Sequence, residues 1–231
     1  MQADTDLIVR VARADVLTEM AFSRSLGHWQ DPDERGIRWK AISEMPSDIL
    51  IGSDDGIIIE GACNHCVSAP DGGTIVVSGD LEAQLDLGGI SEVIISGHVA
   101  PNARITSTGI CHVFVNGDVR GNVSSKDSLK LWVEGSFSGE LLTGSPSTHL
   151  WVSGDMDGHV RPRSKASLLW IFVDGYVHED VLSRIADHGY TTFNASVGKS
   201  NVPKGVYPSP NKYRQLAQQR SFNRWSVSRE S

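Results

Sequence analysis

Residues 93–117 read VIISGHVAPNARITSTGICHVFVNG, and this stretch contains the same short phrase twice. The phrase is an apolar run that ends at a glycine, VIISG at 93–97 and VFVNG at 113–117. It occurs seven times along the chain, and its closing glycines are Gly61, Gly79, Gly97, Gly117, Gly135, Gly154 and Gly175. Subtracting neighbouring positions gives steps of 18, 18, 20, 18, 19 and 21 residues. A period of about 20 residues is typical of a solenoid, in which each unit buries its apolar side against the next.

The residues around each glycine alternate as they do in a β-strand. Two and four positions before the glycine every unit has an aliphatic residue, such as Ile95 and Val93, and most of these are β-branched, which favours strand over helix. The glycine is expected to supply a positive φ at a tight corner, beside the turn residues Asp80, Asp118 and Asp155. We therefore predict an all-β fold, a single parallel β-helix of about seven coils of 18–21 residues, with short α-helical or irregular caps at both ends.

A further position, three residues before each glycine, points out of the tube by the same alternation. Stacked coils align these residues in one apolar stripe, roughly 29 Å long from six rung spacings of about 4.8 Å. The stripe consists of Ile58, Val76, Ile94, Phe114, Trp132, Trp151 and Phe172. Covering half of the four aromatic side chains would remove ~300 Å² from water, on the order of 7 kcal/mol. We therefore predict a partner-binding surface formed by Ile94, Phe114, Trp132, Trp151 and Phe172.

Three segments are expected along the chain. Residues 1–50 lack the repeat and are predicted to form an N-terminal cap, with one helix from Asp15 to about Leu26 and a strand-like alternation in IRWKAISEM (37–45). The apolar side of this helix consists of Leu17, Met20, Ala21 and Phe22. Residues 51–182 form the β-helix, and residues 183–231 form a C-terminal cap and a basic irregular tail. Terminal segments commonly close the open ends of a solenoid, and the stripe is a second surface that the N-terminal cap can cover.

Charge is distributed unevenly along the chain. The net charge is −7, and from Pro203 onward six Lys and Arg residues stand against one glutamate, so the tail carries +5 and the rest carries −7 − 5 = −12. An acidic body argues against nucleic acid as a partner. The N-terminal MQADTDLIVRVARAD has charges inside any apolar core, so no signal peptide or membrane span is expected. Three cysteines suit a reducing compartment, and we expect a cytoplasmic protein.

The residues that carry chemistry in other proteins do not cluster in this sequence. The Cys-x-x-Cys pair at 63–66 begins in an inward column and has no second pair to complete a metal site. His112 and His149 fall in the same outward column, but other residue types occupy that column in other units, so the column is not a row of metal ligands. Asp155 and Asp157 are the nearest to a carboxylate pair of a carbohydrate-active β-helix enzyme, but Asp155 is a corner residue. We predict no catalytic residue, no cofactor and no metal, and hence a protein that is not an enzyme.

The stretch VIISGHVAPNARITSTGICHVFVNGDVRGNV (93–123) resembles the C-terminal β-helix of the MinC cell-division inhibitors. The likeness lies in the V-x-G-D-V corners, the x-N-A-x-I step and the V-x-G-x-V-R-G closure. The small Gly-Val coils also resemble bactofilins, and the likeness covers roughly residues 57–181. It implies a compact, non-catalytic, right-handed β-helix that uses flat faces for self-association or partner binding. In the MinC family one apolar face makes a dimer, and by position that role falls here to Phe114, Trp132, Trp151 and Phe172.

Three functions follow, in order of preference. The first is a non-catalytic interaction or scaffold protein that binds a protein partner, or itself as a homodimer, through the outward stripe. The second is an immunity or inhibitor-type protein whose acidic body neutralises a basic toxin or nuclease. The third is a carbohydrate-active enzyme, which requires a cleft that brings two acids within catalytic reach.

Overall fold

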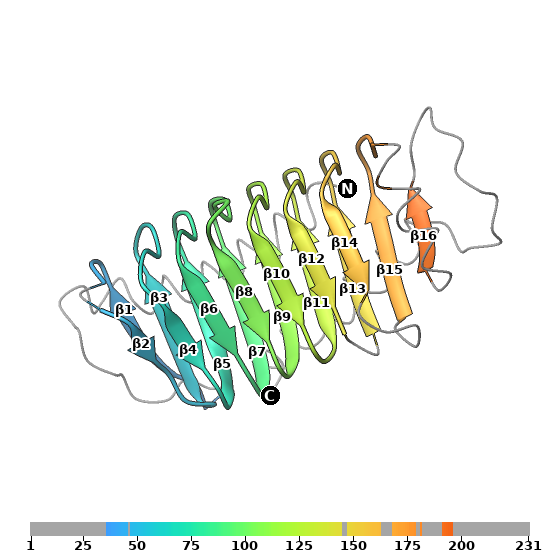
Figure 1. The fold of residues 1–231 in the computed structure, drawn as a ribbon. Coiled ribbons are helices and arrows are strands. Elements are labelled where there is room, and N and C mark those ends of the chain that lie inside the picture. Colours follow the sequence, from blue (N-terminus) through green and yellow to red (C-terminus); the bar gives the residue numbers. More distant parts are fainter. Residues whose placement is uncertain are drawn as a thin grey trace, which may run out of the picture.

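The computed structural model describes residues 36–45, 47–144, 147–162, 168–178, 181 and 191–195, and these residues form a ladder of stacked strands (Figure 1). The named elements are all strands, and every strand pair is parallel, linking successive turns of one tube. The predicted all-β parallel β-helix of about seven turns is therefore confirmed. The predicted helix at 15–26 and the basic tail lie outside the described residues.

Two sheets form two sides of the tube. The nine-stranded sheet contains β1 (Arg38–Ile42), β3 (Asp55–Ile59), β5 (Gly72–Val77), β7 (Ile90–Ile95), β9 (Ile110–Val115), β11 (Leu129–Val133), β13 (Ser147–Val152), β15 (Leu168–Val173) and β16 (Thr191–Ala195), in that order. The seven-stranded sheet contains β2 (Ile49–Leu50), β4 (Val67–Ala69), β6 (Gln84–Leu87), β8 (Arg104–Ser107), β10 (Asn122–Ser125), β12 (Glu140–Thr143) and β14 (His159–Pro162), also in sequence order.

A third, narrower side follows the corner glycine of each turn. It is held by single parallel bridges between the residues two positions after the glycine, which run from Cys63 through Leu81, Val99, Val119, Phe137 and Met156 to Val177. Each turn thus contributes one strand to each sheet and one bridge to the third side. The different lengths of the coils are accommodated in the loops between these sides, so the register of the columns is kept from turn to turn.

The interior of the tube is a single column-ordered core. The aliphatic residues two and four positions before each glycine, such as Ile57, Ile59, Val93 and Ile95, are 0–2% exposed. The column two positions after the glycine is also fully buried, with Phe137 as its one aromatic member. Each Å² of apolar surface removed from water contributes about 25 cal/mol, and this burial along continuous columns holds successive turns together. Side chains therefore fill the interior of the tube.

The corner glycines are required for a reason other than the one the sequence suggests. A positive φ was expected at these corners, but of the seven only Gly61 has one. At Gly79 a Cβ would lie 2.6 Å from the backbone carbonyl carbon of Gly61, well inside van der Waals contact. The amide of Gly79 donates to the carbonyl of Gly61 at 2.8 Å, and the same bond links Gly97 to Gly79. Close backbone approach between turns, rather than dihedral freedom, therefore excludes side chains here.

The first turn of the tube begins before residue 51. Strand β1 pairs with β3 and strand β2 with β4, so both belong to the sheets, and the strand expected in residues 37–45 is confirmed. The guanidinium of Arg38 forms an ion pair with the buried carboxylate of Asp55. The ring of Trp39 lies over Gly56, where a Cβ would clash with it. This contact places an indole on the outer face of the nine-stranded sheet at its N-terminal end.

Candidate functional site

The predicted apolar stripe forms a continuous column on the outer face of the nine-stranded sheet. In-register parallel pairing joins Ile58 to Val76, Val76 to Ile94, Ile94 to Phe114 and so on along the sheet. We call the seven residues the outer column: Ile58, Val76, Ile94, Phe114, Trp132, Trp151 and Phe172. They form an apolar cluster that is separate from the interior core. The side chains therefore lie outside the tube, as the alternation predicts.

The four aromatic rings of the outer column stack on one another. Ring centroids are 5.6 Å apart between Phe114 and Trp132, 4.2 Å between the two tryptophans, and 5.8 Å between Trp151 and Phe172, with interplanar angles of 13–14°. Parallel pairing imposes this arrangement, because equivalent side chains on neighbouring strands repeat about every 4.8 Å. Each such aromatic pair contributes about 0.5–1.5 kcal/mol beyond its buried area.

The outer column points away from the interior of the tube and is nevertheless buried. Its residues are only 0–6% exposed, and Trp132 and Trp151 are each 2% exposed. All sixteen strands of the described part of the chain belong to the wall of the tube, so none of them lies across this face. Alternation along a strand determines which way a side chain points. It carries no information about what lies on top of the side chain, so the alternation alone does not determine whether the outer column is buried.

A second column runs beside the outer column on the same face. Paired positions carry Gly56, Thr74, Glu92, His112, Lys130, His149 and Trp170 along the sheet. His149 stacks on Trp151 with centroids 5.4 Å apart and on Trp170 at 6.0 Å. Burial, with a smaller effect of Lys130, lowers the pKa of His149 to about 4, so the imidazole is neutral at physiological pH. Trp170 and Trp39 extend the apolar face beyond the predicted residues, and shared register with the outer column is the signal that could have identified Trp170.

Two hydrogen-bond donors are buried in the outer column without a partner. The Nε1 atoms of Trp132 and Trp151 are inaccessible to solvent and donate to no acceptor in the part of the chain that the structure describes. An orphaned buried donor costs about 1–3 kcal/mol. Native proteins satisfy the large majority of buried polar atoms, so each exception requires an explanation. A polypeptide that packs on this face and presents acceptors to the two indoles would remove that cost.

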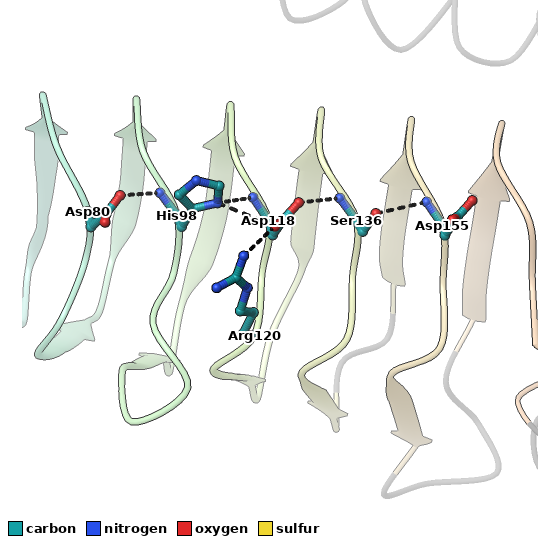
Figure 2. Close-up of polar contacts among 6 residues, drawn as sticks. All are labelled: Asp80, His98, Asp118, Arg120, Ser136 and Asp155. Carbon is teal, nitrogen blue, oxygen red and sulfur yellow. Dashed lines mark hydrogen bonds and ion pairs between the residues drawn. The ribbon is translucent and has the colours of Figure 1, made fainter.

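A ladder of polar side chains runs along the third side, at the position after each corner glycine (Figure 2). The backbone N–H of His98 donates to Asp80 at 2.7 Å, and that of Asp118 donates to the Nδ1 atom of His98 at 2.8 Å. The N–H of Ser136 donates to Asp118 at 2.9 Å, and that of Asp155 donates to the Oγ atom of Ser136 at 3.1 Å. Each side chain thus satisfies the backbone of the next turn, and His98 must carry its proton on Nε2 to accept this bond.

Asp118 is a carboxylate of this ladder that accepts two hydrogen bonds. It accepts from the backbone of Ser136 and from the guanidinium of Arg120 at 2.8 Å (Figure 2). These two contacts, the backbone N–H first, hold the pKa of Asp118 below its usual range. Asp155 likewise accepts from the backbone N–H of Tyr176 at 2.8 Å. The candidate acid of a carbohydrate-type site is therefore engaged in holding a corner.

The corner side of the tube is acidic. The positions one before, one after and three after the corner glycines carry eight carboxylates and, apart from histidine, one cationic residue, Arg120. We call this surface the acidic edge, and its carboxylates are Glu60, Asp80, Glu82, Asp118, Glu134, Asp155, Asp157 and Asp174. Five of them are exposed: Glu60, Glu82, Asp155, Asp157 and Asp174. The acidic body predicted from the sequence is thus concentrated on one side.

Three free cysteines lie in the described part of the chain. Cys63 and Cys111 lie in the interior, and burial raises the pKa of each thiol to about 12. Within the described ranges, no three His, Cys, Asp or Glu side chains are grouped so that they could hold a metal ion. The same part of the chain contains no helix with the length and apolar character to cross a membrane.

Neither protein-family models, nor curated proteins, nor solved structures gave a match to this chain.

Proposed function

We propose that this protein is a non-catalytic β-helical scaffold that binds a polypeptide through its outer column. One observation carries the proposal: a stacked aromatic column, shielded from water, lies on the outside of a tube that already has a complete core of its own. Aromatic side chains, tryptophan above all, dominate the energetics of protein interfaces. The tube wall has no need of these rings for its own closure, because the interior columns are filled without them.

The chemistry of the face defines the segment that it would bind. The outer column offers four flat rings and two unpartnered indole N–H groups, with neutral His149 beside them. A complementary segment is apolar on one side and presents oxygen acceptors to the indoles. The resemblance of residues 57–181 to the β-helices of the MinC family and of bactofilins favours the same kind of use, a flat face for partner binding or for a homodimer.

Paired substitutions test the proposal in the full chain. A tagged chain with Trp132→Ser and Trp151→Ser should lose a partner that the wild type retains, whereas Ile90→Ser with Ile110→Ser should retain it. Ile90 and Ile110 are a matched apolar pair on neighbouring strands, 52% and 38% exposed and away from the outer column. Circular dichroism checks that the serine pair is folded. If it is not, Trp132→Phe with Trp151→Phe decides, because phenylalanine keeps the stacking and removes only the N–H donors.

Equal retention by the wild type and by both tryptophan pairs would contradict binding through the outer column. The mass of the complex in solution shows whether the partner is a second copy of this chain, that is, whether the complex is a homodimer. A homodimer that persists in both tryptophan variants would place the interface on another surface.

The acidic edge favours a second candidate function, an inhibitor or immunity-type protein that neutralises a basic toxin or nuclease. Eight carboxylates beside one guanidinium give this side a strong negative field, which would steer a basic partner and fix its orientation. Binding of this kind weakens as ionic strength rises. A complex that is insensitive to salt between about 50 mM and 500 mM would count against it, and so would a complex that survives Glu82→Gln with Asp157→Asn unchanged.

A further inference from the structure

We propose that two copies of this chain associate face to face through the outer surface of the seven-stranded sheet, related by a two-fold axis that runs parallel to β10 between the copies. This inference goes beyond the proposed function and does not rest on it, because the outer column belongs to the other sheet. It assigns a partner to a surface that neither the aromatic rings nor the acidic edge explains.

The seven-stranded sheet presents two rows of side chains outward. Along β6, β8, β10 and β12 buried and accessible positions alternate, so every second side chain points away from the core. In-register parallel pairing aligns these side chains from strand to strand. We call the two rows from β6 to β14 the polar face: Gln84, Arg104, Asn122, Glu140 and His159 in one row, and Asp86, Thr106, Ser124, Leu142 and Arg161 in the other.

The charges of the polar face are self-complementary about β10. Asp86 and Arg161 share one row, two strands before β10 and two strands after it. Arg104 and Glu140 share the other row, one strand on either side of β10. A two-fold axis parallel to β10 reverses the order of the strands and keeps each row opposite itself. It therefore places each arginine of one copy opposite a carboxylate of the other, Asp86 facing Arg161 and Arg104 facing Glu140.

The uncharged positions fit the same symmetry. On the axis Asn122 and Ser124 meet their own copies, and an amide or a hydroxyl can both donate and accept a hydrogen bond. Lys126, just past the end of β10, is followed by Asp127, so the axis meets no net charge there. Sheets that pack face to face lie about 10 Å apart, a separation that an arginine opposite a carboxylate fits.

No other two-fold axis gives this match. Axes along β6, β8, β12 or β14 set a charged side chain of the polar face opposite its own copy, and like charges so placed repel. Axes along β4, between neighbouring strands or along the tube pair no arginine with a carboxylate. The pattern of charges thus selects one arrangement of the two copies.

The charged side chains are available to a second copy. Arg104 is exposed and makes no ion pair within the described part of the chain. The Nε2 atom of Gln84 donates to both carboxylate oxygens of Asp86 at 2.8 Å and holds that carboxylate on the face. Arg161 contacts Glu140 at 3.1 Å, and their side chains are 63% and 34% exposed, so each has room for a further ion. A dimer adds charge partners without breaking these contacts.

The contact is small, so the dimer should be reversible. Its five strands span four rung spacings of about 4.8 Å, roughly 19 Å, and the two rows lie about 7 Å apart. Even with its margins this patch is smaller than the ~800 Å² that each partner of a stable complex contributes. Salt screens exposed charge pairs, so the chain should sediment as a monomer in about 500 mM salt. The dimer leaves the outer column of each copy on a different sheet, away from the contact.

Sedimentation velocity of the full chain tests the inference. The wild type should associate with rising concentration in about 50 mM salt and dissociate in about 500 mM salt. Arg104→Glu alone and Glu140→Arg alone each set like charges opposite one another, so each should weaken the dimer at least about tenfold. An equimolar mixture of these two variants restores opposite charges at both positions and should dimerise as the wild type does. Glu60→Arg, the same reversal at an exposed corner outside the polar face, should leave the dimer unchanged.

Three results would each overturn the inference: a wild type that remains a monomer at about 100 μM in the lower salt, a dimer that both reversals leave intact, or a mixture that stays monomeric. Circular dichroism checks that the variants are folded. If a reversal is not, Arg104→Gln and Glu140→Gln decide, because they remove the charge without repulsion and should still weaken the dimer. Both tryptophan pairs should dimerise as the wild type does, so a failure of the proposed function would leave this result unchanged.

Discussion

Truncating one central ring tests the packing of the outer column. Trp151 is 2% exposed, and its ring stacks on Trp132 at 4.2 Å and on Phe172 at 5.8 Å. A buried tryptophan removes about 150–250 Å² from water, which at about 25 cal/mol per Å² amounts to about 4–6 kcal/mol. Measured truncations of buried Phe and Trp to Ala fall at about 3–5 kcal/mol. We therefore expect Trp151→Ala to lower the free energy of unfolding by about 3–5 kcal/mol.

The assay is urea unfolding of the full chain, followed by far-UV circular dichroism. Two matched variants accompany it. Trp151→Phe keeps the stacking and removes an N–H that has no acceptor, so its loss should be only about 1 kcal/mol. Tyr176→Ala removes an aromatic side chain that is 51% exposed, and its effect should stay within about 0.5 kcal/mol. In a double-mutant cycle, Trp132→Ala and Trp151→Ala should couple by about 0.5–1.5 kcal/mol.

A loss of less than about 1 kcal/mol for Trp151→Ala would refute this reasoning, since that is the range of surface substitutions. Such a result would mean that the ring stands in solvent in the native chain. A coupling energy near zero would mean that the two indoles do not stack.

Three further predictions concern the corners and the second column. Gly79→Ala should destabilise the chain by about 1–3 kcal/mol or more in urea unfolding, because its Cβ meets backbone atoms of Gly61 that cannot move aside. Asp118→Asn keeps an oxygen acceptor for the next turn but loses the charge that faces Arg120, so it should cost about 0.5–1 kcal/mol at neutral pH. Because the pKa of Asp118 is lowered in the folded chain, its contribution is present above its unfolded pKa of about 3.9 and is lost as the pH falls through the folded value, where the two stability curves should meet. The pKa of His149 is lowered from 6.5 to about 4, so the neutral imidazole stabilises the fold above pH 6.5 and that contribution is lost as the pH falls towards 4. Relative to His149→Gln, the wild type should lose on the order of 2–3 kcal/mol across that interval.

The fold follows from the sequence because each turn repeats the same inward positions. Every unit has equivalents of Val93 and Ile95, and parallel pairing in register then determines the two sheets and the third side. The role of the corner glycines does not follow so directly. A glycine that permits a positive φ and one that permits close backbone approach look alike in a sequence, and Gly79 is of the second kind.

The candidate site could be predicted only in part. The position of Trp132 and Trp151 outside the tube follows from alternation, but alternation does not show whether these side chains are covered, so their burial could not be predicted from the repeat. The corner ladder was visible only as turn residues at Asp118 and its equivalents. His98 and Ser136 occupy the same position and accept the same bond, although aspartate, histidine and serine share no pattern in a sequence.

The burial of the two central tryptophans can be measured directly in solution. The full chain labelled with 5-fluorotryptophan gives one ¹⁹F resonance for each tryptophan, and Trp132→Phe and Trp151→Phe assign two of them. We predict that these two resonances show no shift between H₂O and D₂O in a chain that sediments as a monomer. Shifts as large as those of an unfolded chain would contradict it.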